Sequence, residues 1–114
     1  MNQVALTPDQ IALLQQGFYQ VVHGGGRFNT GRQIGDGAAL SISAKTGTAE
    51  TYVSTPAGVQ KAVNTNVVAY APSQDPQIAV AVVLPNLTDL DSKTTKNIMR
   101  EIINLYHSLH PSGE

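Results

Sequence analysis

The sequence predicts an α+β fold in which helices pack on an antiparallel sheet, in the order helix, strand, strand, strand, helix. Apolar residues at helical spacing occur near both ends of the chain, and residues 78–84 form an unbroken apolar run between them. A short turn before this run predicts a hairpin with the preceding strand. At 114 residues, the chain is one modest domain or a piece of one.

The first helix is predicted over residues 8–23. Thr7 can cap its first turn, Pro8 suits the first helical position, and Gln10 can complete a capping box. The glycines at 24–26 end the helix. Its apolar stripe comprises Ile11, Leu14, Phe18, Val21 and Val22. Residues 24–37 contain six glycines, but their pattern does not match a phosphate-binding loop, so we predict a flexible connector there.

Three strands are predicted next. Residues 40–50 begin with alternating apolar and polar residues, residues 66–71 form the second strand, and residues 78–84 form the third. The polar segment 51–64, which contains Pro56-Ala57-Gly58, is predicted to be a mobile loop beside the first strand. The third strand is expected to be covered on both faces because its apolar run does not alternate.

The closing helix is predicted to follow the end of the sheet at Pro85 and to reach about Leu109. Asp91 or Ser92 is expected to cap it. Its predicted buried stripe comprises Ile98, Ile102, Leu105, Tyr106 and Leu109. In this arrangement strand 78–84 has only one neighbour, which leaves an apolar edge open. We therefore expect sequence outside this chain to supply a second neighbour.

Composition excludes several classes of function. The net charge is −1, and no basic cluster indicates a nucleic-acid partner or an anionic membrane surface. The absence of cysteine excludes disulfides and thiolate metal sites. The longest apolar run is too short to span a bilayer, and nothing near Met1 has the pattern of a signal peptide. Charged residues make up only 13%, which fits either a neutral polar surface or a large contact with further protein.

The segment Lys45-Thr46-Gly47-Thr48 is the one short pattern with a chemical mechanism attached. K-T-G is a signature of the serine acyl-transferases that recognise β-lactams, where it accompanies S-x-x-K and S-x-N. The tetrapeptide alone also occurs on solvated strands with no such function. The histidines at 23, 107 and 110 do not form a metal-like group, and no cofactor is indicated. Asp89 and Asp91 are interpreted as turn and cap residues, Arg27, Arg32 and Lys61 as surface charges, and Phe18 and Tyr106 as core.

The residues from Ile42 to Glu50 resemble the K-T-G-T-A-[EQ] segment of class B penicillin-binding proteins, which are cell-wall D,D-transpeptidases. Residues 6–22 are similar to the preceding helix of that family, and residues 67–72 and 78–83 to its next two strands. The resemblance covers essentially the whole chain and is closest to enzymes of streptococcal type. It implies that residues 1–114 are the C-terminal portion of a transpeptidase domain of the β-lactamase/transpeptidase-like fold.

The resemblance also implies roles for individual residues. The amide N–H of Thr48 would form half of an oxyanion hole, and the hydroxyls of Thr46 and Thr48 would hold a substrate or β-lactam carboxylate. Gly47 would let the substrate approach the backbone, and Lys45 would add positive potential and hydrogen-bond the S-x-N serine. The partners would be a peptidoglycan stem peptide or a β-lactam, at the extracytoplasmic face of the cell membrane.

Two signatures of the family are missing from the sequence. Neither S-x-x-K nor S-x-N occurs, so the nucleophile and its activating lysine must come from the remainder of the domain. We therefore expect this chain alone to be inactive towards β-lactams. Two alternatives remain open at this point: a fragment of a β-lactam-sensing receptor domain, and a non-catalytic interaction module that uses an exposed strand edge.

Overall fold

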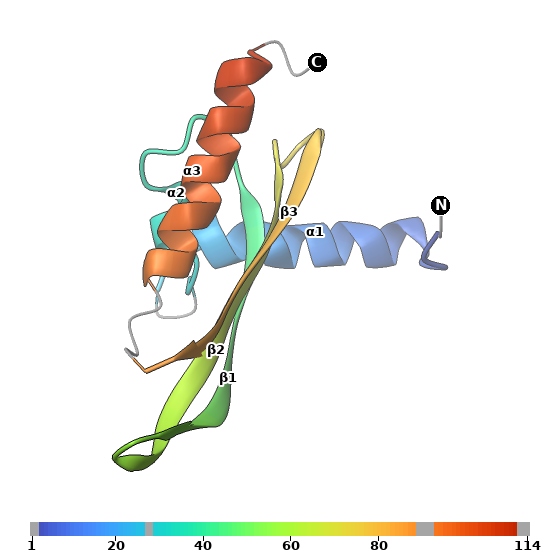
Figure 1. The fold of residues 1–114 in the computed structure, drawn as a ribbon. Helices are drawn as coiled ribbons and strands as arrows, with labels where there is room; N and C mark the ends of the chain where they lie inside the picture. Colours follow the sequence, from blue (N-terminus) through green and yellow to red (C-terminus); the bar gives the residue numbers. More distant parts are fainter. Residues whose placement is uncertain (1–2, 27–28, 89–92, 112–114) are drawn as a thin grey trace.

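The computed structural model describes residues 3–26, 29–88 and 93–111, and it confirms the predicted α+β class (Figure 1). The strands form one antiparallel sheet in the order β1-β2-β3. The elements, in chain order, are α1 (Pro8–His23), α2 (Arg32–Gly35), β1 (Ser43–Thr55), β2 (Gly58–Ala71), β3 (Ile78–Leu87) and α3 (Lys93–Leu109).

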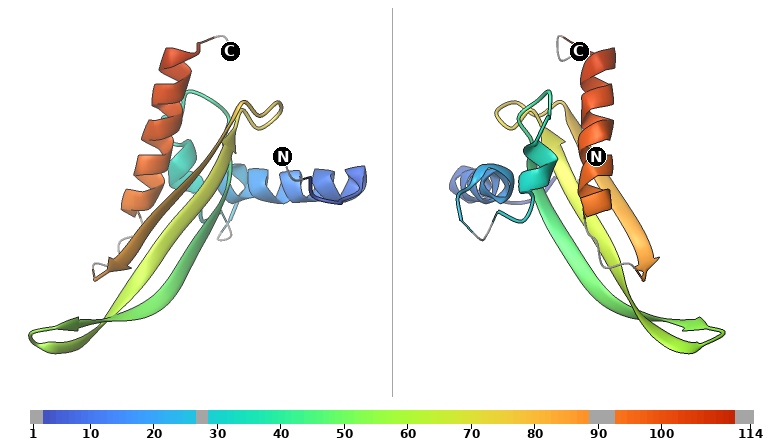
Figure 2. Two further views of the ribbon diagram at one scale, coloured as in Figure 1. Left: turned by 45° about the vertical axis from the view of Figure 1, so that its right-hand side comes forward. Right: turned by 90° about the vertical axis from the view of Figure 1, so that its left-hand side faces the viewer.

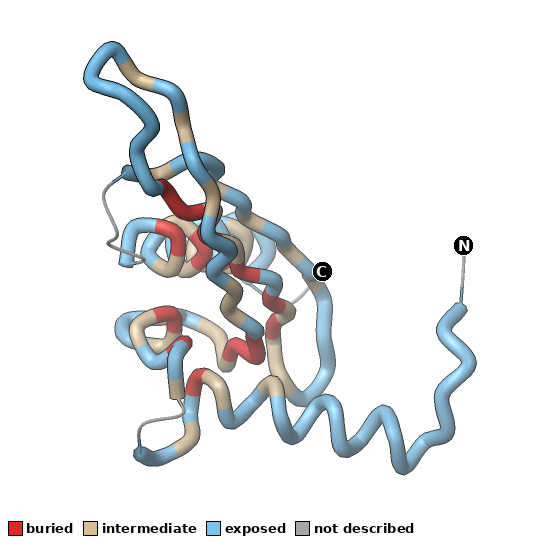
Figure 3. The backbone as a smooth tube through the Cα atoms, turned by 90° about the horizontal axis from the view of Figure 1, so that it is seen from below, coloured by how far each residue is buried: buried red, intermediate tan, exposed pale blue. Residues whose placement is uncertain are grey.

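Helix α1 has the predicted bounds, and its first turn has the predicted capping box. The Thr7 hydroxyl accepts from the Gln10 amide, and the Gln10 side chain accepts from the Thr7 amide. Only the C-terminal end of the helix packs on the rest of the chain, so Val22 is buried while Ile11 and Leu14 remain 41% and 46% exposed. The N-terminal half projects away from the sheet on the side opposite to α3 (Figure 2), and it is exposed along its length (Figure 3).

The prediction of a purely flexible connector over residues 24–37 is wrong, because this segment contains the short helix α2. Ile34 in α2 is completely buried in the core, between α1 and α3. A single helical turn with one apolar residue has no periodicity that a sequence pattern can reveal. The turn is stabilised instead by the packing of Ile34 against α1 and α3.

The prediction of a loop over residues 51–64 is also wrong. Strands β1 and β2 continue through this segment as a regular ladder, in register from Ser43 with Tyr70 to Thr55 with Gly58. Only Pro56 and Ala57 form the turn between them. The pairing of β2 with β3 reaches no further than Val63, so the end of this hairpin extends beyond β3 (Figure 1).

Strand β3 pairs antiparallel with β2, which confirms the predicted hairpin, but it continues through Pro85 to Leu87. Proline is tolerated there because β3 has a neighbour on one side only within the described part of the chain. Its residues alternate between half-buried and exposed, and Val83 is 60% exposed. Among the described residues, therefore, the prediction that both faces of this strand are covered is wrong.

Helix α3 packs on the sheet through a different stripe from the predicted one. Thr95, Met99 and Ile103 are buried, whereas Leu105 and Leu109 are 61% and 67% exposed. The helix has two adjacent apolar stripes, and the sheet covers only one of them. The predicted caps Asp91 and Ser92 lie outside the described residues. The core, to which all three helices and the sheet contribute, consists of Val22, Ile34, Ile42, Ala44, Val67, Ala69, Ala71, Met99 and Ile103.

Candidate functional site

The Lys45–Thr48 segment lies on β1, a strand at the edge of the sheet. Lys45 and Thr48 are exposed, and Thr46 and Gly47 are half-buried. Within the described residues, β2 is the only strand beside β1, so no strand pairs with the outer edge of β1. An open edge presents unpaired backbone groups to which an extended peptide can add as a further strand.

Thr46 and Thr48 share one face of β1, since alternate residues of a strand point the same way. Across the ladder they face Val67 and Thr65 of β2. The Thr46 Oγ1 atom lies 2.8 Å from Oγ1 of Thr30, at hydrogen-bond distance. These threonines belong to a cavity of about 180 Å³, which we call the threonine cavity; it is lined by Thr30, Thr46, Gly47, Thr48, Thr65, Asn66, Val67, Thr95 and Lys96.

A buried hydrogen bond closes the floor of the threonine cavity. The hydroxyls of Thr65 and Thr95 lie 2.5 Å apart, and both residues are almost completely buried. Since Thr65 is on β2 and Thr95 is on α3, this bond fixes the beginning of α3 beside the K-T-G-T strand. Buried hydroxyls need such partners because an unpaired one is costly to desolvate.

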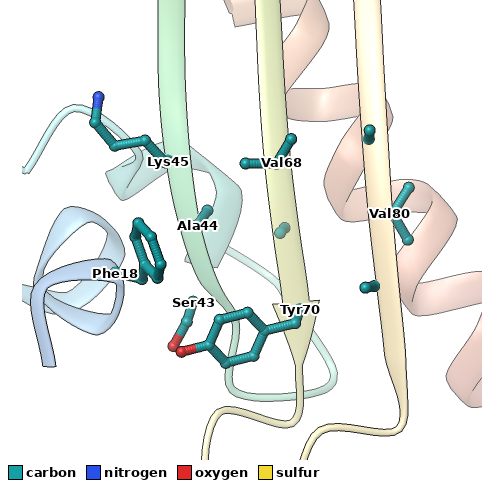
Figure 4. Close-up of a pocket in the computed structure, with 10 residues that line it drawn as sticks. Phe18, Ser43, Ala44, Lys45, Val68, Tyr70 and Val80 are labelled. Carbon is teal, nitrogen blue, oxygen red and sulfur yellow. The ribbon is translucent and has the colours of Figure 1, made fainter. Parts of the chain in front are cut away.

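Lys45 lies on the opposite face of β1 from Thr46 and Thr48. Its Nζ atom donates to the carbonyl oxygen of Thr46 at 2.7 Å. Beside it is an apolar cavity of about 330 Å³, lined by Phe18 of α1, Ser43 and Lys45 of β1, and residues of β2 and β3 (Figure 4). Phe18 and Tyr70 meet edge to face at this cavity, with ring centroids 6.4 Å apart.

The sheet face around this apolar cavity is open. Val68 and Val83 are 51% and 60% exposed, and Ala79 and Ala81 on the same face are exposed as well. The Tyr70 hydroxyl is buried without a hydrogen-bond partner among the described residues. Exposed apolar faces of this kind are typical of surfaces that bind other protein.

Gly47 is in close contact with a neighbouring side chain. A Cβ atom at this position would lie 2.5 Å from Oδ1 of Asn66, its partner across the ladder. The glycine therefore leaves room for Asn66 within the sheet; the access to the backbone that the resemblance implies stays a prediction.

Three of the four predicted site residues, Thr46, Gly47 and Thr48, line the threonine cavity, whereas Lys45 lines the apolar cavity on the opposite face. The threonine cavity also has neighbours that sequence reasoning missed. Thr30, Asn66, Thr95 and Lys96 reach the site from other elements, and no motif singles them out. Phe18 and Tyr106, which were predicted to be core, are half-buried.

The remaining candidates lie apart from this site. Lys61 pairs with Glu50 on the hairpin at 3.1 Å, and Arg32 is exposed on α2. His23 Nε2 lies 2.9 Å from the Ile42 carbonyl oxygen, and His110 stacks on Tyr106. Arg27, Asp89 and Asp91 lie outside the described residues. No group of three potential metal ligands occurs within residues 3–26, 29–88 and 93–111.

An antiparallel sheet with K-T-G-T on its open edge strand and a closing helix on one face is typical of penicillin-recognising acyl-transferases. The sequence model of the family described as "Penicillin binding protein transpeptidase domain" matches residues 1–104. The chain therefore belongs to the penicillin-binding protein transpeptidase domain family. The resemblance to class B enzymes of streptococcal type is confirmed by the relatives below.

Penicillin-binding protein 2B of Streptococcus pneumoniae is 54% identical over 111 residues, which is 97% of this chain and 16% of that protein. Penicillin-binding protein 2A of Bacillus subtilis is 32% identical over 117 residues, which is 96% of this chain and again 16% of the relative. The chain thus spans about a sixth of the length of these curated relatives.

Solved structures confirm the fold. The structure of penicillin-binding protein 2B from S. pneumoniae strain R6 matches with a TM-score of 0.88 and 54% identity, over 97% of this chain and 17% of that one. Pseudomonas aeruginosa PBP2 in complex with WCK 5153 matches with a TM-score of 0.66 and 28% identity, over 92% of this chain and 21% of that one.

Proposed function

We propose that residues 1–114 are the C-terminal part of a penicillin-binding D,D-transpeptidase domain and provide one wall of its substrate cleft. The observation that carries this proposal is the position of K-T-G-T on an open edge strand, with its threonine side chains in a polar cavity. Family membership supports the same function. The whole enzyme acts on peptidoglycan stem peptides in the bacterial cell wall.

The substrate lies along β1 as an added strand. The Thr48 N–H then forms half of the oxyanion hole, and the Thr46 and Thr48 hydroxyls bind the carboxylate of the substrate or β-lactam. Loss of one oxyanion-hole donor costs about 3–4 kcal/mol of transition-state stabilisation. The Lys45 ammonium, exposed in this chain, supplies positive potential and a hydrogen bond to the serine of S-x-N.

The remainder of the domain contributes the nucleophile. Its S-x-x-K serine attacks the carbonyl carbon of the D-Ala–D-Ala bond, and the terminal D-Ala leaves as the serine ester forms. An amine of a neighbouring stem peptide then attacks that ester, which forms the cross-link and releases the serine. The open apolar face around Val68 and Val83 and the open edge of β3 provide the surfaces against which the remainder packs.

The site of action that follows from this function is the extracytoplasmic face of the cell membrane. Among the helices in the described part of the chain, none combines the length and the apolar character needed to cross a bilayer.

A graft tests the proposed function. This chain replaces the matching segment of S. pneumoniae penicillin-binding protein 2B, and the chimera is exposed to a fluorescent penicillin. We expect covalent labelling of the chimera and none of residues 1–114 alone. Lys45→Met should slow labelling by about tenfold or more, since a hydrogen bond from a charged group contributes about 1.5–3 kcal/mol.

The surface variant Lys61→Met serves as the matched control, because it removes the same charge from an exposed residue of the hairpin. A folded chimera that takes up no penicillin would contradict the proposal, as would labelling of this chain by itself.

A further inference from the structure

We propose that Lys96 on α3 is an additional binding residue for the carboxylate of the substrate or β-lactam. This inference rests on the proposed function, because it concerns the anion that Thr46 and Thr48 would hold. Lys96 is half-buried and lines the threonine cavity together with both of these residues. Its ammonium is a cation on a flexible stem, suited to pairing with a carboxylate beside the two hydroxyls.

The position of Lys96 is fixed by its neighbour in the sequence. Thr95 hydrogen-bonds Thr65, and Thr65 lies directly across the ladder from Thr48. The backbone of α3 is therefore held beside β2 at the level of the K-T-G-T segment. Lys96 follows Thr95 directly and lines the threonine cavity from α3.

The charges around the cavity favour an anion. None of the described residues that line it is acidic. Among the described carboxylates close in sequence to these residues, Glu50 is paired with Lys61 and Glu101 with Arg100. Within the described ranges, Lys96 itself has no hydrogen bond or ion pair, so its ammonium is available. Partial burial strengthens its attraction for an anion, since the effective dielectric is lower there than in water.

Thr30 completes the set of polar groups. Its hydroxyl contacts that of Thr46 and can donate to it, which leaves the Thr46 proton free to point at a ligand. A carboxylate has about four lone-pair sites and can accept from the Thr46 hydroxyl, the Thr48 hydroxyl and the Lys96 ammonium at once. A lysine with a purely structural role, which buries its stem and keeps its charge in water, would not respond to the charge of the ligand.

The test uses the chimera with penicillin-binding protein 2B and compares two ligands: benzylpenicillin, which carries a carboxylate, and its methyl ester, which does not. We expect Lys96→Gln to lower the acylation rate with benzylpenicillin by about tenfold, as for loss of one charge-assisted hydrogen bond, and to leave the rate with the ester unchanged. Lys96→Arg should restore most of the rate, because it keeps the cation. Lys61→Gln, with the same charge change on the hairpin, should react like the unsubstituted chimera.

The outcomes separate the two proposals. Equal rates for Lys96→Gln and the unsubstituted chimera with benzylpenicillin would overturn the role of Lys96 and leave the proposed function intact. An equal slowing with both ligands would also overturn it, since the effect would then be structural. An unsubstituted chimera that folds, as judged by thermal unfolding, but takes up no penicillin would contradict the proposed function and this role together.

Discussion

Gly47 leaves space for the side chain of Asn66 within the sheet, in addition to its proposed role in letting the substrate approach. Because a Cβ atom would lie 2.5 Å from the Asn66 side chain, any other residue at this position must displace that side chain. The K-T-G motif identifies the glycine from sequence, but it does not reveal this contact. Asn66 is 19 positions away, and only the register of β1 on β2 brings the two residues together.

We expect Gly47→Ala to destabilise the chimera by about 1–3 kcal/mol, as overpacking does. The double substitution Gly47→Ala with Asn66→Ala should recover most of this loss, because it removes the clash. Penicillin uptake should stay slow in the double variant if the substrate also needs the space. Chemical denaturation and labelling rates measure the two effects.

Gly25→Ala is the control, since a Cβ atom there meets nothing within 4 Å. Failure of the Asn66 substitution to restore stability would show that the contact is not the cause.

The Thr65–Thr95 hydrogen bond holds α3 against β2 beside the threonine cavity. Thr95→Val should destabilise the domain by about 1–3 kcal/mol, because it leaves the buried Thr65 hydroxyl unpaired. Thr65→Val with Thr95→Val should cost less than the sum of the single changes, which a double-mutant cycle measures. Thr94→Val, at an exposed position of the same helix turn, provides the comparison. If the two single effects on the unfolding free energy are fully additive in the double variant, the two hydroxyls do not stabilise the domain through this hydrogen bond.

At the scale of elements, sequence patterns predict the helices and strands whose apolar residues or end signals are regularly spaced. The capping box and glycines predict both ends of α1. The end of the β1–β2 hairpin is missed because it extends beyond β3, so it lacks the alternation of apolar and polar residues that one-sided burial produces. Lys45–Thr48 is found through its motif, whereas Thr30 and Lys96 come near it only through folding.

Helix α3 shows why an apolar stripe in the sequence does not by itself reveal which side of a helix is buried. Its two apolar stripes are adjacent, and only packing on the sheet selects the one with Met99 and Ile103. Ile103→Ala should therefore lower the unfolding free energy of the chimera by about 2–5 kcal/mol. The exposed Ser108→Ala on the same helix should change it by less than about 0.5 kcal/mol. Similar effects of both changes on denaturant midpoints would contradict this packing.

At the scale of the whole molecule, three surfaces lack a covering element among the described residues. They are the outer edge of β3, the sheet face with Val68 and Val83, and the outer stripe of α3 with Leu105 and Leu109. Uncovered apolar surfaces are what we expect if sequence outside this chain supplies a second neighbour for strand 78–84. The outer edge of β1 differs from them, because β1 carries the polar K-T-G-T segment, in which Lys45 and Thr48 are exposed.

The most direct test of the proposed division of labour is reconstitution from two separate polypeptides. Residues 1–114 are mixed with the preceding portion of S. pneumoniae penicillin-binding protein 2B, treated with fluorescent penicillin and separated on a denaturing gel. We predict that label appears on the larger polypeptide only, and only when this chain is present. Label on the band of this chain, or equal labelling of the larger polypeptide without it, would contradict the claim that these residues supply the binding strand but not the nucleophile.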